Sequence, residues 1–140
     1  FEELDPGAWG PKFVVASVLR DSGRFEEALA YQKRAVELSG GAPQMLGFLA
    51  LTLTRIGEAA EARSLLERIQ AIATRTYVSP SSLAWAHVGL GEYNEALERL
   101  GQAIDERDSM IVPIKTYPFL DPLRPDPRFA ALIRRMNLEP

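Results

Sequence analysis

The sequence predicts an all-α fold in which antiparallel helix pairs stack side by side into a solenoid. Three observations lead to this prediction: a period of 34 residues, a glycine that divides each period into two helix-forming halves, and a proline-rich segment that ends the periodicity. Internal repeats of roughly 20 to 50 residues are typical of solenoids, because each repeat buries its apolar face against the next one. We therefore expect three helix pairs followed by a different C-terminal element.

The period is clearest at three glycines. The segments GRFEEAL, GEAAEAR and GEYNEAL begin at Gly23, Gly57 and Gly91, at spacings of 34 residues. Four columns are identical in all three copies, namely Ala16/Ala50/Ala84, Gly23/Gly57/Gly91, Glu27/Glu61/Glu95 and Ala28/Ala62/Ala96. Residue frequencies alone would give about 0.3 such columns by chance, so the repeat is genuine.

Each copy predicts two helices, and the copies span residues 9–42, 43–76 and 77–110. In the first half of each copy two side chains recur at helical spacing, as in Val15 with Leu19, Leu49 with Leu53, and Leu83 with His87. The glycine then ends the helix, because the position just past a helix end favours left-handed dihedral angles. The alanine columns place small residues on both helices of a pair, which lets the two helices approach closely.

Aromatic residues open two of the three second helices. Phe25 and Tyr93 are expected to fill the gap at the turn of the first and third copies. Ala59 stands in the same column of the second copy. We therefore expect the turn of the second copy to be packed less tightly.

The first eight residues continue the same register backwards. Leu4 and Pro6 fall in the columns that end a repeat, so residues 1–8 are interpreted as the end of a preceding repeat. Because a repeat buries its face only against a neighbour, this interpretation predicts that the chain is the C-terminal piece of a longer protein.

The period breaks after residue 110. Residues 111–125 contain four prolines, which oppose a continuous helix and predict an extended path with turns. Asp126 and Pro127 are a typical helix start, so residues 126–140 are expected to form a capping helix. Its apolar residues recur at helical spacing and would cover the open side of the last repeat; they are Phe129, Leu132, Ile133 and Met136.

The columns of residues 9–110 resemble the tetratricopeptide repeat (TPR) family, whose unit is a 34-residue helix–turn–helix. The matching residues are Leu49 and Leu83 at the seventh position, the six alanines of the identical columns, and Ala35 and Ala103 late in the second helix. The sequence departs from the family pattern at the fourth position, where Lys12, Leu46 and Pro80 replace Trp. The resemblance implies a module that binds other proteins and needs no cofactor.

The C-terminal part carries a second resemblance. The segments TYVSPSSLAW and PFLDPLRPDPRFAALIRRM are similar to the closing part of TPR tails in bacterial multidomain signalling and regulatory proteins. This resemblance implies a cytoplasmic bacterial protein whose signalling domain lies elsewhere.

The sequence argues against catalysis and against metal binding. It has no cysteine and a single histidine, His87, and it contains no glycine-rich phosphate loop, no HExxH motif and no GxSxG motif. The paired acids Glu26/Glu27 and Glu95/Glu98 are interpreted as solvated helix faces. His87 is expected to be half-buried and bonded to a backbone carbonyl, with a ligand-binding or pH-sensing role as the alternative.

Nucleic acid and membrane are not the expected partners. The net charge is −3, which cannot supply the many phosphate contacts that nucleic-acid binding needs. No apolar run reaches the roughly 18 residues needed to cross a bilayer.

The TPR resemblance implies a ligand site on the concave face, lined by the second, fifth, sixth, ninth and twelfth positions of each repeat. Carried over column by column, these are Phe13, Val14, Ser17 and Arg20 in the first copy, Gln44, Gly47, Phe48, Leu51 and Thr54 in the second, and Val78, Ser81, Ser82, Trp85 and Val88 in the third. Most are apolar or small, so a clamp for two carboxylates is not expected. Exposed Phe13, Phe48 and Trp85 would instead bind an apolar or aromatic peptide.

Two functions remain open on the sequence alone. The first is a non-catalytic module that binds a peptide or partner segment on the concave face. The second is a self-associating or intramolecular scaffold, in which residues 111–125 or a neighbouring chain, as in a homodimer, already fill the groove. The first is the function we expect, and the second is kept as the alternative because a large uncovered apolar patch is unusual on a soluble monomer.

Deletion of residues 126–140 should uncover the last repeat. Burial of each of the four apolar residues of the capping helix is worth roughly 1.5 to 3 kcal/mol. We expect aggregation or a large fall in melting temperature, measured by circular dichroism and light scattering. A truncated protein that stays monomeric and melts at the temperature of the full chain would show that the helix is not a cap.

Overall fold

The computed structural model describes residues 9–136, so the expected end of a preceding repeat at residues 1–8 lies outside the described part. Within it the chain forms α1 (Trp9–Asp21), α2 (Phe25–Leu38), α3 (Pro43–Arg55), α4 (Ala59–Ala73), α5 (Pro80–Gly89), α6 (Tyr93–Asp105), the 3-10 helices η2 (Ser109–Ile111) and η3 (Pro118–Leu123), and α7 (Pro127–Arg135). No strand occurs between residues 9 and 136. None of the described helices is long and apolar enough to span a membrane.

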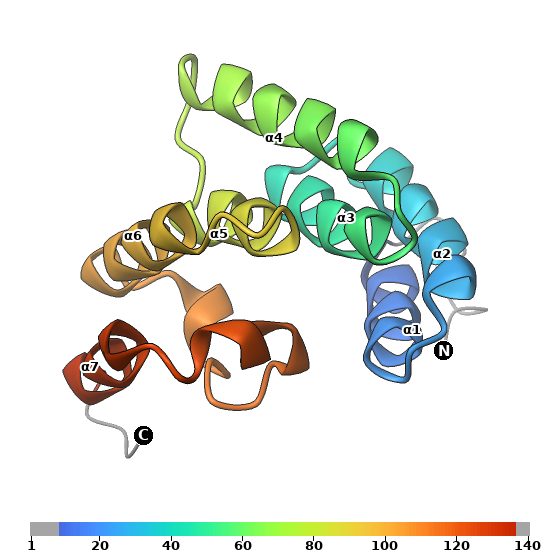
Figure 1. Cartoon of the computed structure of the whole chain (residues 1–140). Helices are drawn as coiled ribbons and strands as arrows, with labels where there is room; N and C mark the ends of the chain where they lie inside the picture. Colours follow the sequence, from blue (N-terminus) through green and yellow to red (C-terminus); the bar gives the residue numbers. More distant parts are fainter. Residues whose placement is uncertain (1–8, 137–140) are drawn as a thin grey trace.

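Three helix pairs follow one another along the chain, as the period predicts (Figure 1). The second helices begin at Phe25, Ala59 and Tyr93, 34 residues apart. Helix α5 begins at Pro80, three residues later than the period alone would place it, because proline suits the first turn of a helix and not its interior. The all-α, TPR-type helix-pair solenoid is thus confirmed.

The glycine turns and the alanine columns behave as the sequence predicts. Gly23, Gly57 and Gly91 have φ angles of +82°, +86° and +76°, in the left-handed region that disfavours a side chain. All six alanines of the identical columns are fully buried. Small side chains at these positions therefore allow the two helices of each pair to pack closely.

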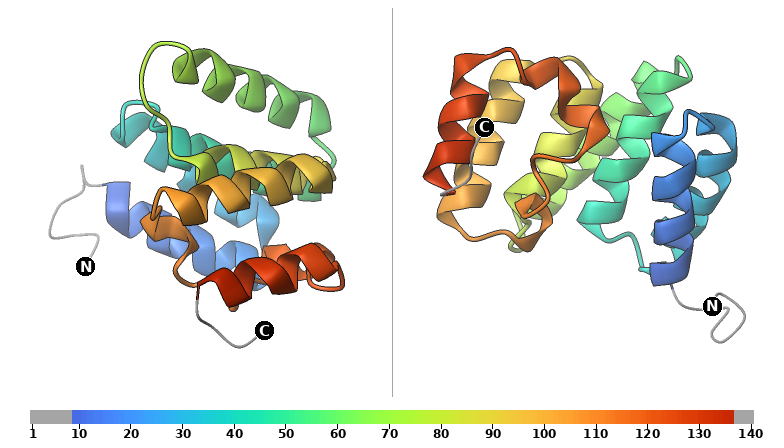
Figure 2. Two further views of the ribbon diagram at one scale, coloured as in Figure 1. Left: turned by 90° about the vertical axis from the view of Figure 1, so that its left-hand side faces the viewer. Right: turned by 90° about the horizontal axis from the view of Figure 1, so that it is seen from below.

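The segment after α6 is not extended, which corrects the sequence-based expectation. It winds through η2 and η3 before reaching α7, and Pro118 is compatible with η3 because it occupies its first turn. The segment folds back across the array, so that η3 lies opposite α3 and α5, and α7 lies against α6 (Figure 2). Prolines here interrupt an α-helix but permit tight helical turns.

Helix α7 caps the last repeat. The Asp126 carboxylate accepts a hydrogen bond from the backbone N–H of Arg128 at 2.9 Å, and Phe129, Leu132 and Ile133 are buried against the core that includes α6. Arg135 pairs with Asp105 at the C-terminal end of α6. A capping helix is therefore present from Pro127 to Arg135, shorter than the expected residues 126–140.

Helices α3 and α5 approach closely at Gly47. A Cβ atom at this position would lie 2.6 Å from the backbone carbonyl oxygen of Ser82, which cannot move without shifting α5. By contrast, a Cβ atom at Gly101 in α6 would lie 3.6 Å from the nearest atom, an ordinary contact. Close packing against α5 thus requires glycine at position 47, whereas no close contact requires it at position 101.

We expect Gly47→Ala to lower the free energy of unfolding by about 1 to 3 kcal/mol, because the added methyl group overpacks the α3–α5 contact. The matched control Gly101→Ala should instead raise it by about 0.5 to 1 kcal/mol, because alanine favours a helix. Urea denaturation of both variants measures the difference. Equal effects of the two substitutions would contradict the close α3–α5 approach.

Candidate functional site

The inner side of the solenoid carries a cluster of aromatic side chains. The ring of Phe13 in α1 lies 4.9 Å from that of Phe48 in α3, and the ring of Phe48 lies 5.9 Å from that of Trp85 in α5. The repeat register therefore brings one aromatic residue from each first helix to a common surface, as the sequence analysis expected.

This surface is not exposed, which corrects the expectation for Phe48 and Trp85. Their relative exposures are 1% and 0%. Phe119 of η3 covers them, with its ring 4.9 Å from that of Trp85 and 6.2 Å from that of Phe48. Tyr117 adds an edge contact to Trp85 at 5.4 Å. This arrangement agrees with the alternative in which residues 111–125 cover the aromatic side chains.

Hydrogen bonds hold the covering segment in place. The Tyr117 hydroxyl donates to the backbone carbonyl of Met110 at 2.7 Å, and the Arg124 guanidinium donates to the backbone carbonyl of Tyr117 at 2.8 Å. Burial raises the pKa of Tyr117 to about 12, so the hydroxyl stays a donor at neutral pH. The cover is thus fixed by polar contacts as well as by aromatic packing.

The other residues expected in the groove divide by burial. Arg20, Gly47, Leu51, Ser81, Ser82 and Val88 are buried, whereas Phe13, Ser17, Gln44, Thr54 and Val78 are partly buried and Val14 is exposed. Ser81 and Ser82 are buried because α5 packs against α3 and because the Ser81 N–H donates to Asp108 at 3.1 Å. Most of the residues carried over from the family thus lie on an inner side that other parts of this chain already cover.

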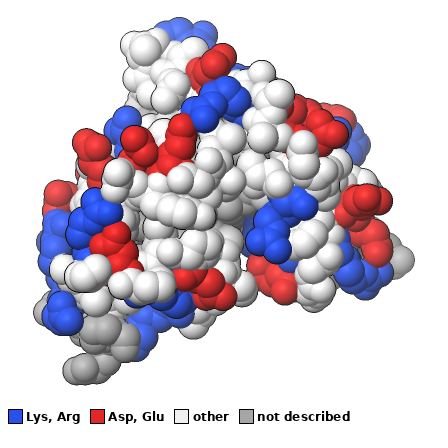
Figure 3. Space-filling model, in the orientation of Figure 1, with Lys and Arg blue, Asp and Glu red and all other residues white. Residues whose placement is uncertain are grey.

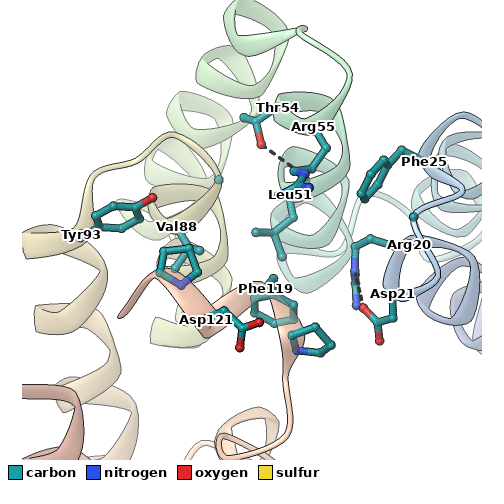
Figure 4. A pocket seen from close by; sticks show the side chains of 14 residues that line it. Arg20, Asp21, Phe25, Leu51, Thr54, Arg55, Val88, Tyr93, Phe119 and Asp121 are labelled. Carbon is teal, nitrogen blue, oxygen red and sulfur yellow. Dashed lines mark hydrogen bonds and ion pairs between the residues drawn. The ribbon is translucent and has the colours of Figure 1, made fainter. Parts of the chain in front are cut away.

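One solvent-accessible cleft remains beside the aromatic cluster. It has a volume of about 710 Å³ and lies between the C-terminal ends of α1, α3 and α5, the start of α6, and η3 (Figure 4). Its lining includes four of the residues predicted from the sequence, namely Arg20, Leu51, Thr54 and Val88. It also includes residues that the repeat columns did not indicate, among them Asp21, Phe25, Arg55, Tyr93, Phe119 and Asp121.

The residues that sequence reasoning missed lie at turns and in η3. Phe25 and Tyr93 open second helices at the turns, where the sequence predicted only a packing role. Tyr93 is 39% exposed, so its ring does not fill the gap at the turn of the third copy as expected. The segment PFLDPL signals a proline-rich turn, but only the fold shows that Phe119 reaches the inner side.

Arg20 is a buried cation in the wall of this cleft. It is 5% exposed, and its guanidinium carbon lies 5.2 Å from the ring centres of both Phe48 and Phe119. Its Nε donates to the carboxylate of Asp21 at 3.3 Å, while its Nη1 has no hydrogen-bond partner among residues 9–136. Burial lowers the pKa of Arg20, although a guanidinium stays protonated at neutral pH.

Arg55 is a second cation of the cleft and is exposed. Its guanidinium carbon lies 5.0 Å from the centre of the ring of Phe25, at the start of α2 in the preceding helix pair. It forms no ion pair within the part of the chain that the structure describes. The wider surface around the inner side carries scattered charges of both signs separated by uncharged areas (Figure 3).

His87 belongs to a separate cluster and bonds to a carboxylate, which corrects the expected backbone partner. It is 6% exposed, and its Nδ1 lies 2.9 Å from Oε1 of Glu92. Oε2 of Glu92 accepts a hydrogen bond from Arg63 of α4 at 2.8 Å. The three side chains join α4, α5 and the turn before α6. Across residues 9–136 no group of three or more His, Asp or Glu residues is placed to hold a metal ion.

Comparison with known families supports the TPR resemblance. Residues 19–79, from the end of α1 to the residue before α5, match the family model described as tetratricopeptide repeat. The comparisons with curated proteins and with solved structures gave no significant match. The resemblance of the C-terminal segment to bacterial signalling proteins lies outside the matched residues and stays a prediction.

Truncation of Trp85 should destabilise the protein. We expect Trp85→Ala to lower the free energy of unfolding by about 3 to 5 kcal/mol, because the side chain is enclosed by Phe48, Tyr117 and Phe119. Tyr77 is 70% exposed, so Tyr77→Ala is the control and should change stability by about 0.5 kcal/mol. If Trp85→Ala melted like the control, Trp85 would not be a core residue.

The Glu92 cluster predicts a pH dependence of stability. The Arg63 hydrogen bond, with a further contribution from His87, lowers the pKa of Glu92 below its ordinary value of 4.5. A carboxylate with a depressed pKa stabilises the fold above its unfolded-state pKa, and this contribution disappears as the pH falls through the folded-state value. At pH 7 we expect Glu92→Gln to lose about 1 kcal/mol of stability or less, since the pair is partly solvated.

Glu92→Gln and the unaltered protein should differ less in free energy of unfolding as the pH is lowered from 4.5, the ordinary pKa of a glutamate, through the folded-state pKa of Glu92. Denaturant titrations at several pH values measure it. Glu95→Gln, at an exposed position in α6, is the matched control and should show no such trend. A Glu92→Gln effect that is constant from neutral to acidic pH would rule out the stabilising carboxylate.

Proposed function

We propose that this protein is a non-catalytic interaction module that binds a peptide segment of a partner protein in the cleft on the inner side of its solenoid. TPR repeats generally mediate interactions between proteins, and the matched residues include α3, whose Leu51 and Thr54 line this cleft. The observation that carries the proposal is that the inner side already holds a segment of chain, η3, next to a cleft that is still open.

The contacts of η3 indicate how a peptide would bind. Phe119 packs against Trp85 and Phe48, so the inner surface accommodates an aromatic side chain presented by a short helical turn. The adjoining cleft combines an apolar wall with a few polar groups, which is typical of ligand-binding pockets. Of the residues carried over from the family, Arg20, Leu51, Thr54 and Val88 are the ones we propose as direct contacts.

A second candidate function is an intramolecular or self-associating scaffold. The specific observation in its favour is the same cover: Phe119 occupies the aromatic surface, and the hydrogen bonds of Tyr117 and Arg124 fix the segment that carries it. In this case the helix pairs would position an attached domain or a second copy of the chain, and the cleft would bind no external peptide.

The cellular context is proposed from the C-terminal resemblance alone. The similarity of the segment after α6 to tails of bacterial multidomain proteins suggests a role in the bacterial cytoplasm, attached to a signalling or regulatory domain. The partner would then be a protein that this domain must recognise.

A selection from a random peptide library tests the two candidates. Peptides enriched on the immobilised 140-residue protein would be synthesised and titrated into the ¹⁵N-labelled chain. Peptide binding in the cleft should shift the backbone amide signals of Gly23 and Gly89, which line it, and leave Gly57, which does not, unchanged. A concentration-independent monomer in light scattering should accompany this result.

Two results would contradict the peptide-binding function. One is the absence of any enriched peptide that shifts the cleft amides. The other is a stable dimer in which the cleft signals are already altered by the second copy. Either result would favour the scaffold.

A further inference from the structure

We infer that the partner segment of the cleft carries an acidic side chain, whose carboxylate is bound by Arg55 and attracted by Arg20, next to an apolar or aromatic side chain. This inference rests on the proposed function, because it assigns the chemistry of the peptide that the same cleft binds. It differs from a clamp for two carboxylates, since the expected ligand has one carboxylate and an apolar neighbour.

The first step of the argument is the unfilled hydrogen-bonding capacity of Arg20. A buried guanidinium usually has its donors satisfied, because desolvation of an unpaired charge is costly. Here Nε makes a single contact of 3.3 Å to Asp21, and Nη1 has no partner among the described residues. The Asp21 side chain is itself 37% exposed, so water weakens this pair. The carboxylate of Asp21 therefore compensates the Arg20 charge only in part.

Arg55 provides the accessible cation. Its guanidinium carbon lies over the Phe25 ring, 5.0 Å from the ring centre, and the side chain is exposed. No carboxylate between residues 9 and 136 forms an ion pair with it. Since a guanidinium can bind a carboxylate with two parallel hydrogen bonds, Arg55 has the chemistry of a receptor for an acidic side chain.

Both acidic residues of the cleft are already paired. Asp21 contacts Arg20, and Asp121 pairs at 2.7 Å with Arg124, which lies outside the lining. The formal charges of the lining residues balance, and Arg55 is the cation among them that has no ion pair within residues 9–136. An anionic ligand would complement it, whereas a cationic peptide would face Arg55 directly.

The remaining lining residues favour a peptide over a small anion as the ligand. They are apolar and partly aromatic, formed by Leu51, Val88, Tyr93, Pro118, Phe119 and Pro122. A carboxylate alone would leave these walls in contact with water. A peptide that places an apolar side chain beside its acidic one would cover them and gain the hydrophobic contribution.

The closing experiment uses two pools of synthetic octapeptides, acetylated and amidated at their ends. Both pools fix Phe at the fourth position; one fixes Glu and the other Gln at the fifth, and the other positions mix uncharged residues. Each pool is titrated into the ¹⁵N-labelled full chain. We expect the Glu pool to shift the Gly23 and Gly89 amides, and the Gln pool to bind about fivefold more weakly.

Matched variants test the assigned cation. Arg55→Gln should abolish the preference for Glu while lowering the melting temperature by only a few degrees, because the side chain is exposed and loses one contact, with the Phe25 ring. Arg75→Gln removes an equally exposed arginine that does not line the cleft, and it should keep the full preference. Raising the salt concentration should weaken only the Glu pool.

Three results would overturn the inference. They are equal binding of both pools at the cleft, a preference for Glu that survives Arg55→Gln, and binding of phenylacetate as tight as that of the Glu pool. The last would assign the cleft to small aromatic carboxylates, which should otherwise bind about tenfold more weakly. Equal binding of both pools at the cleft would leave the proposed peptide-binding function intact, whereas failure of every library peptide would reject that function itself.

Discussion

The packing of Phe119 against Trp85 connects the repeat array to everything that follows it. Without a cover, the first helices would expose a continuous aromatic surface, because the repeat places Phe13, Phe48 and Trp85 in neighbouring columns. A chain that leaves such a surface in water tends to associate. By folding η3 back onto it, the protein fills the inner side with its own atoms. The course of the proline-rich segment and the boundary of the cleft both depend on this contact.

The cleft exists because the cover is shorter than the surface it meets. η3 spans Pro118–Leu123 and reaches the middle of the inner side, so the region near the turns of the first and third pairs stays open. Arg20 lies at the border, with its guanidinium near the rings of Phe48 and Phe119 and with unfilled donors. The same contact that buries the aromatic cluster therefore places Arg20, whose carboxylate partner is the partly exposed Asp21, beside the open part of the inner side.

The repeat itself could be predicted from the sequence, because its determinants are local. Gly23, Gly57 and Gly91 stop helices through backbone geometry, and the alanine columns fix how closely each pair packs. The start of α5 shows the limit of the period, since Pro80 delays it. The burial of Trp85 could not be read from the helix period. A residue about 200° away from Leu83 does face away from α6, but the period says nothing about which distant segment lies there. The role of Arg55 is equally non-local, since it depends on the stacking of Phe25 from a neighbouring pair.

The most direct measurement of the central claim is the contact between η3 and α5 in solution. In a Trp9→Phe variant, Trp85 is the single tryptophan, so its indole proton signals are assigned without ambiguity. The ring centres of Trp85 and Phe119 are 4.9 Å apart, which predicts strong nuclear Overhauser effects between the two rings. These effects should be present at low protein concentration, where only contacts within one chain persist. Their absence, together with free quenching of Trp85 fluorescence by acrylamide, would show that the inner side is uncovered and would contradict the account.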